Sequence, residues 1–157
     1  MARKPWYGDG VQFQCQGSGK CCSSRGEYGF VYLTKDDAKN MASVLKMKTG
    51  EFKKKYTKRT DGALHLIDHP TSDDCLFLKG NRCEVYEGRP TQCRTWPFWP
   101  ENMKPKAWNK AVVQFCPGVN KGSVRKIDDI QKQLKDQQLA DADIWGSALT
   151  EFEDRLV

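Results

Sequence analysis

Seven cysteines in three groups are the feature that most constrains this chain of 157 residues. The groups are Cys15, Cys21 and Cys22; then Cys75, Cys83 and Cys93; and finally Cys116. The first residues contain no apolar run of the length a signal peptide needs, and no stretch approaches the ~20 apolar residues of a membrane span. We therefore expect a cytoplasmic protein with no membrane partner. In that compartment thiols stay reduced and bind metal more often than they form disulfides.

The first cysteine group lies in a segment that is poor material for a hydrophobic strand. Polar residues and glycines surround it from Gln14 to Ser24. An isolated cysteine is often only a small buried apolar residue, but a polar loop has little reason to carry three of them unless they bind something. Gly17 and Gly19 allow a tight bend that aims backbone N–H groups at sulfur or an anion. Metal ligation is the favoured interpretation.

The second cysteine group is more widely spaced, with seven residues between Cys75 and Cys83 and nine between Cys83 and Cys93. No C-x₂₋₄-C pair is present, which disfavours a simple zinc finger. Cys116-Pro117 matches the Cys-Pro ending of bacterial ferredoxin motifs and slightly favours an iron–sulfur cluster over zinc. Because four thiolates fill one tetrahedral site, seven favour a multinuclear site or two neighbouring sites.

Two histidines, His65 and His69, are weaker ligand candidates. Their spacing of four would place them on one face of a helix. Pro70 and the apolar residues between the histidines instead predict a strand that ends in a turn, so the structural interpretation is favoured for both.

Helical patterns occupy the insert between the first two cysteine groups, at about residues 34–58. Thr34 to Asp37 resembles a capping box, with Asp37 in place of the usual Glu or Gln. Apolar residues then follow at helical spacing. Thr49 is predicted to cap a second short helix, in which Phe52 and Tyr56 share a face.

Strands are predicted at Phe30–Leu33, Leu64–Ile67, Leu76–Leu78 and Trp108–Val113, with a turn at Gly80-Asn81. Four prolines between residues 88 and 105 predict an ordered loop and exclude a long helix. From Ser123 onward two apolar stripes predict two helices that break near Asp141–Asp143. Their positions are Ile127, Ile130 and Leu134, then Trp145, Leu149, Phe152 and Leu156.

These patterns predict an α+β fold: a small, loop-rich, cysteine-cluster metal-binding domain over residues 1–122 and a C-terminal helical segment over 123–157 that packs on it. The formal net charge is +6, and the basic excess gathers around Lys53, Lys54, Lys55, Lys58 and Arg59. A solvated helix face explains this run better than a nucleic-acid surface, so a nucleic-acid partner is not expected.

The motifs resemble the YkgJ-type cysteine-cluster family, known as a zinc- or iron-chelating domain. The resemblance covers roughly residues 13–122, and all seven cysteines fall on motif positions. The matching segments are Phe13-x-Cys15-Gln-Gly-Ser-Gly-x-Cys21-Cys22, Leu33-Thr-x-x-Asp37, Glu51-Phe52-x-x-x-Tyr56, Cys75-x-Phe-Leu78, Cys83-x-x-Tyr86-x-x-Arg89-Pro90-x-x-Cys93-Arg94-Thr-x-Pro97-Phe98 and Cys116-Pro117-Gly118. Ser18 departs from the pattern, because many members have a further cysteine there, and the number of ligands is therefore open.

This resemblance implies binding of metal or of an iron–sulfur cluster but specifies no reaction. Relatives include proteins named as flagellin lysine N-methylases and others described as iron–sulfur oxidoreductases. No G-x-G-x-x-G or Walker loop is present, so nothing supports a dinucleotide or ATP site.

Arginines and aromatic residues accompany the cysteines. Arg89 and Arg94 are candidates for offsetting thiolate charge or binding an anionic cofactor or substrate, with a structural salt bridge as the alternative. A dry shell around the metal is predicted from Tyr86, Trp96, Phe98 and Trp99, in preference to a stacking surface for a nucleobase.

Three functions follow from these observations. The first is an iron–sulfur or iron protein with a role in electron transfer or redox catalysis, and with a protein redox partner. The second is a zinc protein, structural or metal-handling, in which closed sites contribute folding energy. The third is a metal-dependent enzyme that modifies a protein.

Overall fold

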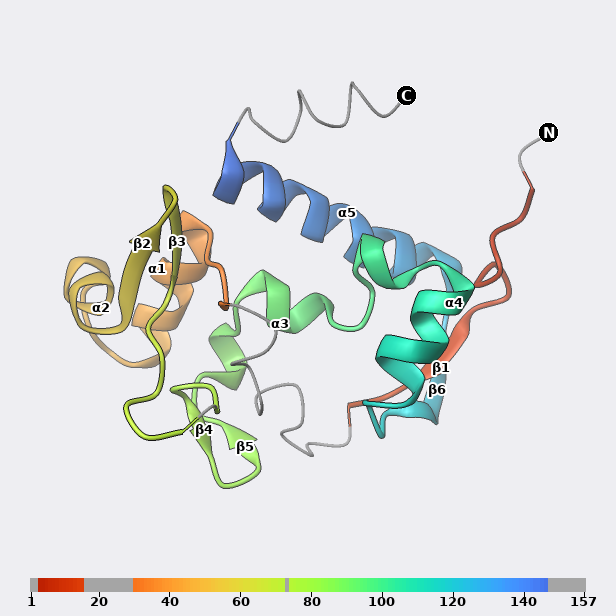
Figure 1. The fold of residues 1–157 in the computed structure, drawn as a ribbon, viewed down its shortest axis with the longest axis horizontal. Helices are drawn as coiled ribbons and strands as arrows, with labels where there is room; N and C mark the ends of the chain where they lie inside the picture. Colours follow the sequence, from red (N-terminus) through yellow and green to blue (C-terminus); the bar gives the residue numbers. More distant parts are fainter. Residues whose placement is uncertain (1–2, 16–29, 73, 147–157) are drawn as a thin grey trace.

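The computed structural model describes residues 3–15, 30–72 and 74–146, and Figure 1 shows it as a ribbon. Short strands and helices follow one another irregularly along the chain, which confirms the α+β class. In chain order the elements are β1 (Val11–Phe13), α1 (Lys35–Val44), α2 (Thr49–Tyr56), β2 (Thr57–Thr60), β3 (Ala63–Leu66), β4 (Leu78–Lys79), β5 (Arg82–Cys83), the 3₁₀ turn η3 (Tyr86–Gly88), α3 (Thr91–Thr95), the 3₁₀ turn η4 (Pro100–Asn102), α4 (Pro105–Ala107), the π-helix η5 (Trp108–Val113), β6 (Val119–Arg125) and α5 (Ile127–Trp145).

The strands of the described residues form three antiparallel pairs, β1 with β6, β2 with β3, and β4 with β5. All four residues of β3 are buried. Val31 and Leu33 lie along β3 and exchange backbone hydrogen bonds with it, from Leu33 N–H to Leu64 and from Leu66 N–H to Val31, at 2.9 and 3.0 Å. The strand expected at 30–33 is thus an extended segment that pairs only through an isolated bridge between Tyr32 and His65.

Two hydrophobic cores divide the interior. The first lies among α1, α2 and β3 and consists of Val31, Leu33, Ala38, Met41, Ala42, Phe52, Leu64, Leu66, Phe77 and Val85. The second lies among β1, η5 and the start of α5 and consists of Val11, Phe13, Phe98, Met103, Trp108, Val112 and Ile130. Figure 1 shows the first group of elements on the left and the second on the right, with α3 between them.

Helix α5 connects the two cores. Near its start Ile130 is fully buried in the second core. Near its end the Trp145 ring lies 4.9 Å from the Tyr32 ring, and the Asp143 carboxylate accepts a hydrogen bond from the Lys35 N–H at the start of α1. Figure 1 shows α5 crossing the molecule next to α3. Within the described residues, no helix is long and apolar enough to cross a membrane.

The helices of the insert follow their predicted patterns closely. Thr34 caps α1, its hydroxyl accepts from the Asp37 N–H, and the Asp37 carboxylate accepts from the Thr34 N–H, which confirms the capping box. In α2, Phe52 and Tyr56 lie in ring contact at 5.5 Å. The cap of α2 is Lys48 rather than Thr49, which is already the first helical residue and makes no capping hydrogen bond.

Three predictions about the later elements are wrong. The strand expected at 108–113 is the π-helix η5, because Trp108 and Val112 are buried four residues apart, as on one face of a helix, while Val113 is exposed. The break expected at 141–143 is absent, since no proline or glycine interrupts α5 before Gly146, whose φ of +66° follows the last helical residue. The strand expected at 76–78 begins only at Leu78.

Strand β6 was not expected, and neither was its partner β1. β6 runs across the boundary between the two segments predicted at residues 122 and 123. Its pairing with β1 joins the chain just before Cys15 to the chain just after Cys116. The division into two segments stays a prediction, and the stripe positions at 149, 152 and 156 lie outside the described residues.

Candidate metal centre

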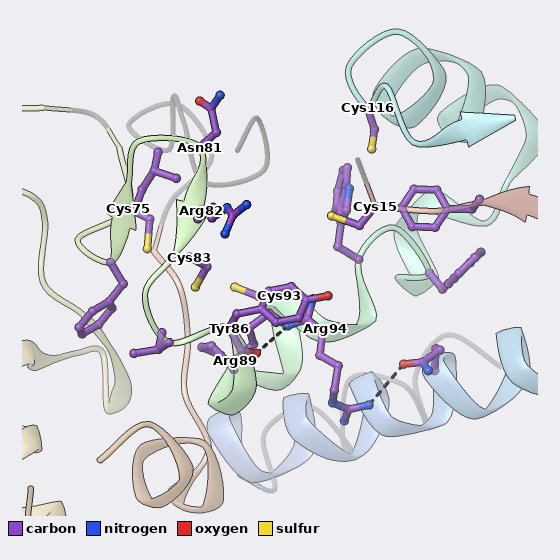
Figure 2. A pocket seen from close by; sticks show the side chains of 18 of the residues that line it. Cys15, Cys75, Asn81, Arg82, Cys83, Tyr86, Arg89, Cys93, Arg94 and Cys116 are labelled. Atoms are coloured by element: carbon purple, nitrogen blue, oxygen red, sulfur yellow. Dashed lines mark hydrogen bonds between the residues drawn. The ribbon is translucent and has the colours of Figure 1, made fainter. Parts of the chain in front are cut away.

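All five cysteines of the described residues line one pocket, which has a volume of about 590 Å³. Its wall takes residues from both cores, including Met41, Leu66 and Phe77 from the first and Phe13 and Phe98 from the second. The pocket therefore lies between the two cores. Figure 2 shows the labelled cysteines around it.

Three of these cysteines come from the side of the first core. Cys75 precedes β4, Cys83 lies in β5, and Cys93 lies in α3, and all three are partly buried against that core. The hairpin turn at Gly80-Asn81 is as predicted, with Gly80 at a φ of +62°. This turn folds β5 back along β4 and so brings Cys83 toward Cys75.

Cys15 and Cys116 come from the other side. Cys15 follows β1, and Cys116 follows η5, where its N–H bonds to the Val112 carbonyl at 2.8 Å. The Gln14 N–H bonds to the Gly118 carbonyl at 3.0 Å, which keeps the two segments adjacent. A Cβ atom on Gly118 would lie 2.5 Å from the Gln14 carbonyl oxygen, so this close approach requires glycine. Figure 2 shows Cys15 and Cys116 on one side and Cys75, Cys83 and Cys93 on the other.

Of the seven predicted ligands, the five that the structure describes therefore line one pocket. Cys21 and Cys22 lie outside the described residues. Within the described ranges, no three His, Cys, Asp or Glu side chains come close enough together to bind a metal ion. The donor type is nevertheless the one that iron and zinc prefer, because thiolates are soft ligands. The residues thus fit such a metal by chemistry, and the assignment of individual ligands stays a prediction.

Helix α3 holds Cys93 in place through hydrogen bonds on two sides. The buried Asp37 carboxylate accepts from the Thr91 N–H at 3.0 Å and from its hydroxyl at 2.9 Å. At the other end of this helix the Thr95 hydroxyl lies 2.7 Å from Oε1 of Gln137 in α5. Thr95 is completely buried. The short helix that carries Cys93 is thus tied to α1 and to α5.

Arg94 points away from the cysteines. Its guanidinium lies 3.2 Å from the Asp136 carboxylate and 3.4 Å from the Gln133 amide oxygen, both on α5, and Figure 2 shows it extending toward that helix. Burial raises the pKa of the Asp136 carboxyl, but hydrogen bonds from Lys132 and Arg94 and their positive charges outweigh it and leave this pKa below its usual value. The structural alternative for Arg94, a salt bridge, is present.

Arg89 lies over the ring of Tyr86, with its guanidinium carbon 3.8 Å from the ring centroid and its Nε donating to the Tyr86 carbonyl at 3.0 Å. This contact fixes the plane of the guanidinium at the pocket wall. Tyr86 itself is 49% exposed and so does not form part of a dry shell. Of the other three aromatics predicted for that shell, Trp96 and Phe98 line the pocket.

The histidines take no part in the pocket lining. His65 is buried in β3, where one ring nitrogen lies 2.8 Å from the Thr60 hydroxyl and the other 2.8 Å from the Leu66 carbonyl. Both nitrogens are therefore engaged. His69 Nδ1 accepts from the Thr71 N–H at 3.2 Å.

Several lining residues were not anticipated from the sequence. They are polar or charged and come from the β4–β5 hairpin, from the end of β6 and from the first half of α5: Asn81, Arg82, Arg125, Asp129 and Gln133. The hairpin residues were detectable in principle, because they adjoin Cys83. Those of α5 had no signal, because their place in the wall depends on how α5 packs.

Comparison with known proteins assigns the class. Residues 14–117 match the CxxCxxCC family, described as "Putative zinc- or iron-chelating domain". The site and this match define a metal-binding protein. Because the match covers more than half of the 157 residues, the chain belongs to this family. Helix α5 lies beyond the matched residues.

A similar protein occurs in Methanocaldococcus jannaschii. This uncharacterized protein is 25% identical over 131 residues, which cover 80% of the present chain and 68% of the relative. No solved structure matches the chain.

Proposed function

We propose that the cysteine thiolates bind an iron–sulfur cluster or iron between the two cores, and that this centre serves electron transfer or redox catalysis in the cytoplasm. The observation that carries the proposal is the convergence of Cys15, Cys75, Cys83, Cys93 and Cys116 on one pocket. Cys21 and Cys22 complete the proposed ligand set. Seven thiolates exceed one tetrahedral site, which favours a multinuclear centre or two neighbouring ones.

The surroundings of the cysteines support such a centre. Four of the five are partly buried, and Phe98, Trp96 and Phe115 line the same pocket. Apolar walls limit the access of water and oxygen to a bound cluster, and the protein's influence on such a centre acts through burial and nearby charge. Arg89 is proposed to contribute positive charge at the wall, which offsets the charge of the thiolates. Arg94, the other candidate, contributes less because its guanidinium is paired with Asp136. When bound, iron would supply one-electron chemistry.

Iron is preferred over zinc on ligand spacing and on Cys116-Pro117, and a direct experiment separates them. The protein is purified without oxygen, and its iron, zinc and sulfide contents are measured together with its visible absorbance. We expect a brown protein with iron, with thiolate-to-iron charge-transfer absorption. A colourless protein with stoichiometric zinc and no iron would contradict the iron assignment and support the zinc alternative.

Single substitutions test the ligand assignment. Cys83→Ser and Cys116→Ser remove one thiol from each side of the pocket, and each is expected to lower the metal content and bleach the absorbance. His69→Gln is the matched control, because His69 is a potential ligand by type but does not line the pocket. If metal content follows the histidine and not the cysteines, the proposed centre is wrong.

The third function, metal-dependent modification of a protein, makes a different prediction. Substitution of Arg94, which is not a metal ligand, would then abolish function in a genetic complementation test while the metal remains bound. A protein redox partner is proposed for the electron-transfer role. Neither a membrane nor nucleic acid is needed for it.

A further inference from the structure

The cysteines form only part of the pocket lining. Its volume of about 590 Å³ falls in the ~300–1,000 Å³ range of small-molecule sites. Most of its lining residues are not cysteines, and most of these are arginines or aromatic or apolar side chains. A site of this kind can accept an organic molecule beside the thiolates.

The charged groups of the wall favour an anion. Four arginines line the pocket: Arg82, Arg89, Arg94 and Arg125. Asp129 is its one acidic residue among those described, and Arg125 already lies 3.4 Å from it. Arg94 is likewise paired, with Asp136.

Arg82 differs from the paired arginines. In the described part of the chain its guanidinium has no hydrogen-bond or ion-pair partner. Figure 2 shows it extending from β5 toward the space between the two groups of cysteines. Arg89 stands on the same side of the pocket, with its plane fixed against Tyr86. A guanidinium presents donors in a fork that matches a carboxylate or a phosphate.

A second, independent observation concerns Trp96, which also lines the pocket. The indole Nε1 of Trp96 is buried and has no hydrogen-bond partner among the described residues. Native proteins seldom leave a buried donor unpaired, and a bound ligand is one of the ordinary reasons when they do. Trp96 also contacts Phe115 edge to face, with 6.2 Å between ring centroids and 85° between the ring planes, so aromatic surface lies beside Trp96.

We propose that this pocket binds a small ring-bearing anion, whose carboxylate or phosphate lies at Arg82 and whose ring lies against Trp96 and Phe115. The inference deepens the proposed function and rests on it for the use of the ligand as a redox substrate. Binding itself does not depend on the identity of the metal. An alternative role for Arg82, compensation of thiolate charge, makes different predictions.

Calorimetric titration of the metal-loaded protein tests the proposal with three probes. Benzoate and phenyl phosphate carry the two anionic groups on one ring, and benzamide is the neutral counterpart of benzoate. We expect saturable binding of at least one anion and at least about tenfold weaker binding of benzamide, because a charge-assisted hydrogen bond contributes roughly that factor. The tighter anion identifies the recognised group.

Two variants locate the site. Arg82→Gln is expected to weaken anion binding about tenfold or more, and Trp96→Phe, which keeps a ring but removes the N–H group, is expected to weaken it several-fold. Arg59→Gln is the matched control, since Arg59 is an exposed arginine on β2 that does not line the pocket. Metal content is measured for every variant.

The outcomes separate this proposal from the metal centre. Absence of saturable binding of both anions, equal binding of benzamide, or wild-type affinity in Arg82→Gln overturns the anion site. Loss of metal from Arg82→Gln, without anion binding by the wild type, assigns Arg82 to charge compensation and also overturns it. If the protein purified without oxygen contains neither iron nor zinc and still binds the anion, the proposed function is overturned and the anion site stays in place.

Discussion

Asp37 is the residue on which the positions of two helices depend. It is only 4% exposed, and its two carboxylate oxygens accept hydrogen bonds from Thr34 at the start of α1 and from Thr91 at the start of α3. One oxygen thus completes a capping box, and the other fixes the helix that carries Cys93. A carboxylate near helix N-termini also meets the positive end of the helix dipole.

Replacing Asp37 is expected to destabilise the protein strongly. Asp37→Ala leaves the Thr34 and Thr91 N–H groups without their acceptor, so the free energy of unfolding should fall by about 2–4 kcal/mol, which combines a lost cap with unsatisfied donors. Asp37→Asn keeps one acceptor oxygen and should cost less. Urea denaturation measures both variants.

Asp36 provides the control for this substitution. It is exposed in the same first turn of α1, and Asp36→Ala should cost less than about 1 kcal/mol, the range of a helix-dipole interaction. Similar losses at both positions would mean that the contact between α1 and α3 does not stabilise the fold.

At the scale of elements, helices and turns are predicted best from the sequence where contacts between neighbouring residues determine them. The capping box at Thr34, the shared face of Phe52 and Tyr56, and the turn at Gly80 all depend on residues within four positions of one another. The cysteine pattern predicts a metal site for a similar reason, and the five described cysteines line one pocket. Thiolates in polar loops indicate metal wherever the loops lie in space.

Prediction from sequence failed where distant contacts decide. β1 is short and β6 is mostly exposed without alternation, and their pairing joins segments more than a hundred residues apart. Val112 and Val113 suggested a strand by propensity, yet the burial of Trp108 and Val112 in the second core selects a π-helix. The orientation of Arg94 likewise depends on Asp136, which no local pattern connects to it.

The contact between α3 and α5 is expected to depend on pH through Asp136. Because the folded-state pKa of this carboxyl lies below its unfolded value of 3.8, its contribution to stability is full above about pH 5 and is lost as pH falls through the folded-state pKa. Asp136→Asn should therefore be less stable than the wild type near neutrality, and the difference should shrink as the pH falls below about 4. Urea denaturation across a pH series measures it.

Lys132→Gln refines the interpretation of that series. Lys132 is the second cation on Asp136, at 3.1 Å, and its removal leaves Arg94 in place. This variant should retain part of the pH dependence. Parallel stability curves for the wild type and Asp136→Asn would show instead that the carboxyl titrates alike in the folded and unfolded chains.

At the scale of the whole molecule, the pocket lies along the boundary between the two hydrophobic cores, which we call the seam. Cys75, Cys83 and Cys93 pack on one core and Cys116 packs on the other. In the protein alone, α5 connects the two, with Ile130 in one core and Trp145 against Tyr32 beside the other. A metal centre with ligands from both sides would add a second connection, directly across the seam.

Removal of the metal is therefore expected to loosen both cores together. Binding to the folded state alone stabilises it by about 2.7 kcal/mol at a hundredfold excess over the dissociation constant, and ligands from both sides distribute that gain over both cores. Hydrogen exchange of α1 and of η5, before and after treatment with a chelator, measures the two cores separately. The turn at Asp61-Gly62, which is not part of the pocket lining, serves as the internal control. If only α1 loses protection, the ligands belong to the side of Cys75, Cys83 and Cys93 alone, and a centre across the seam is excluded.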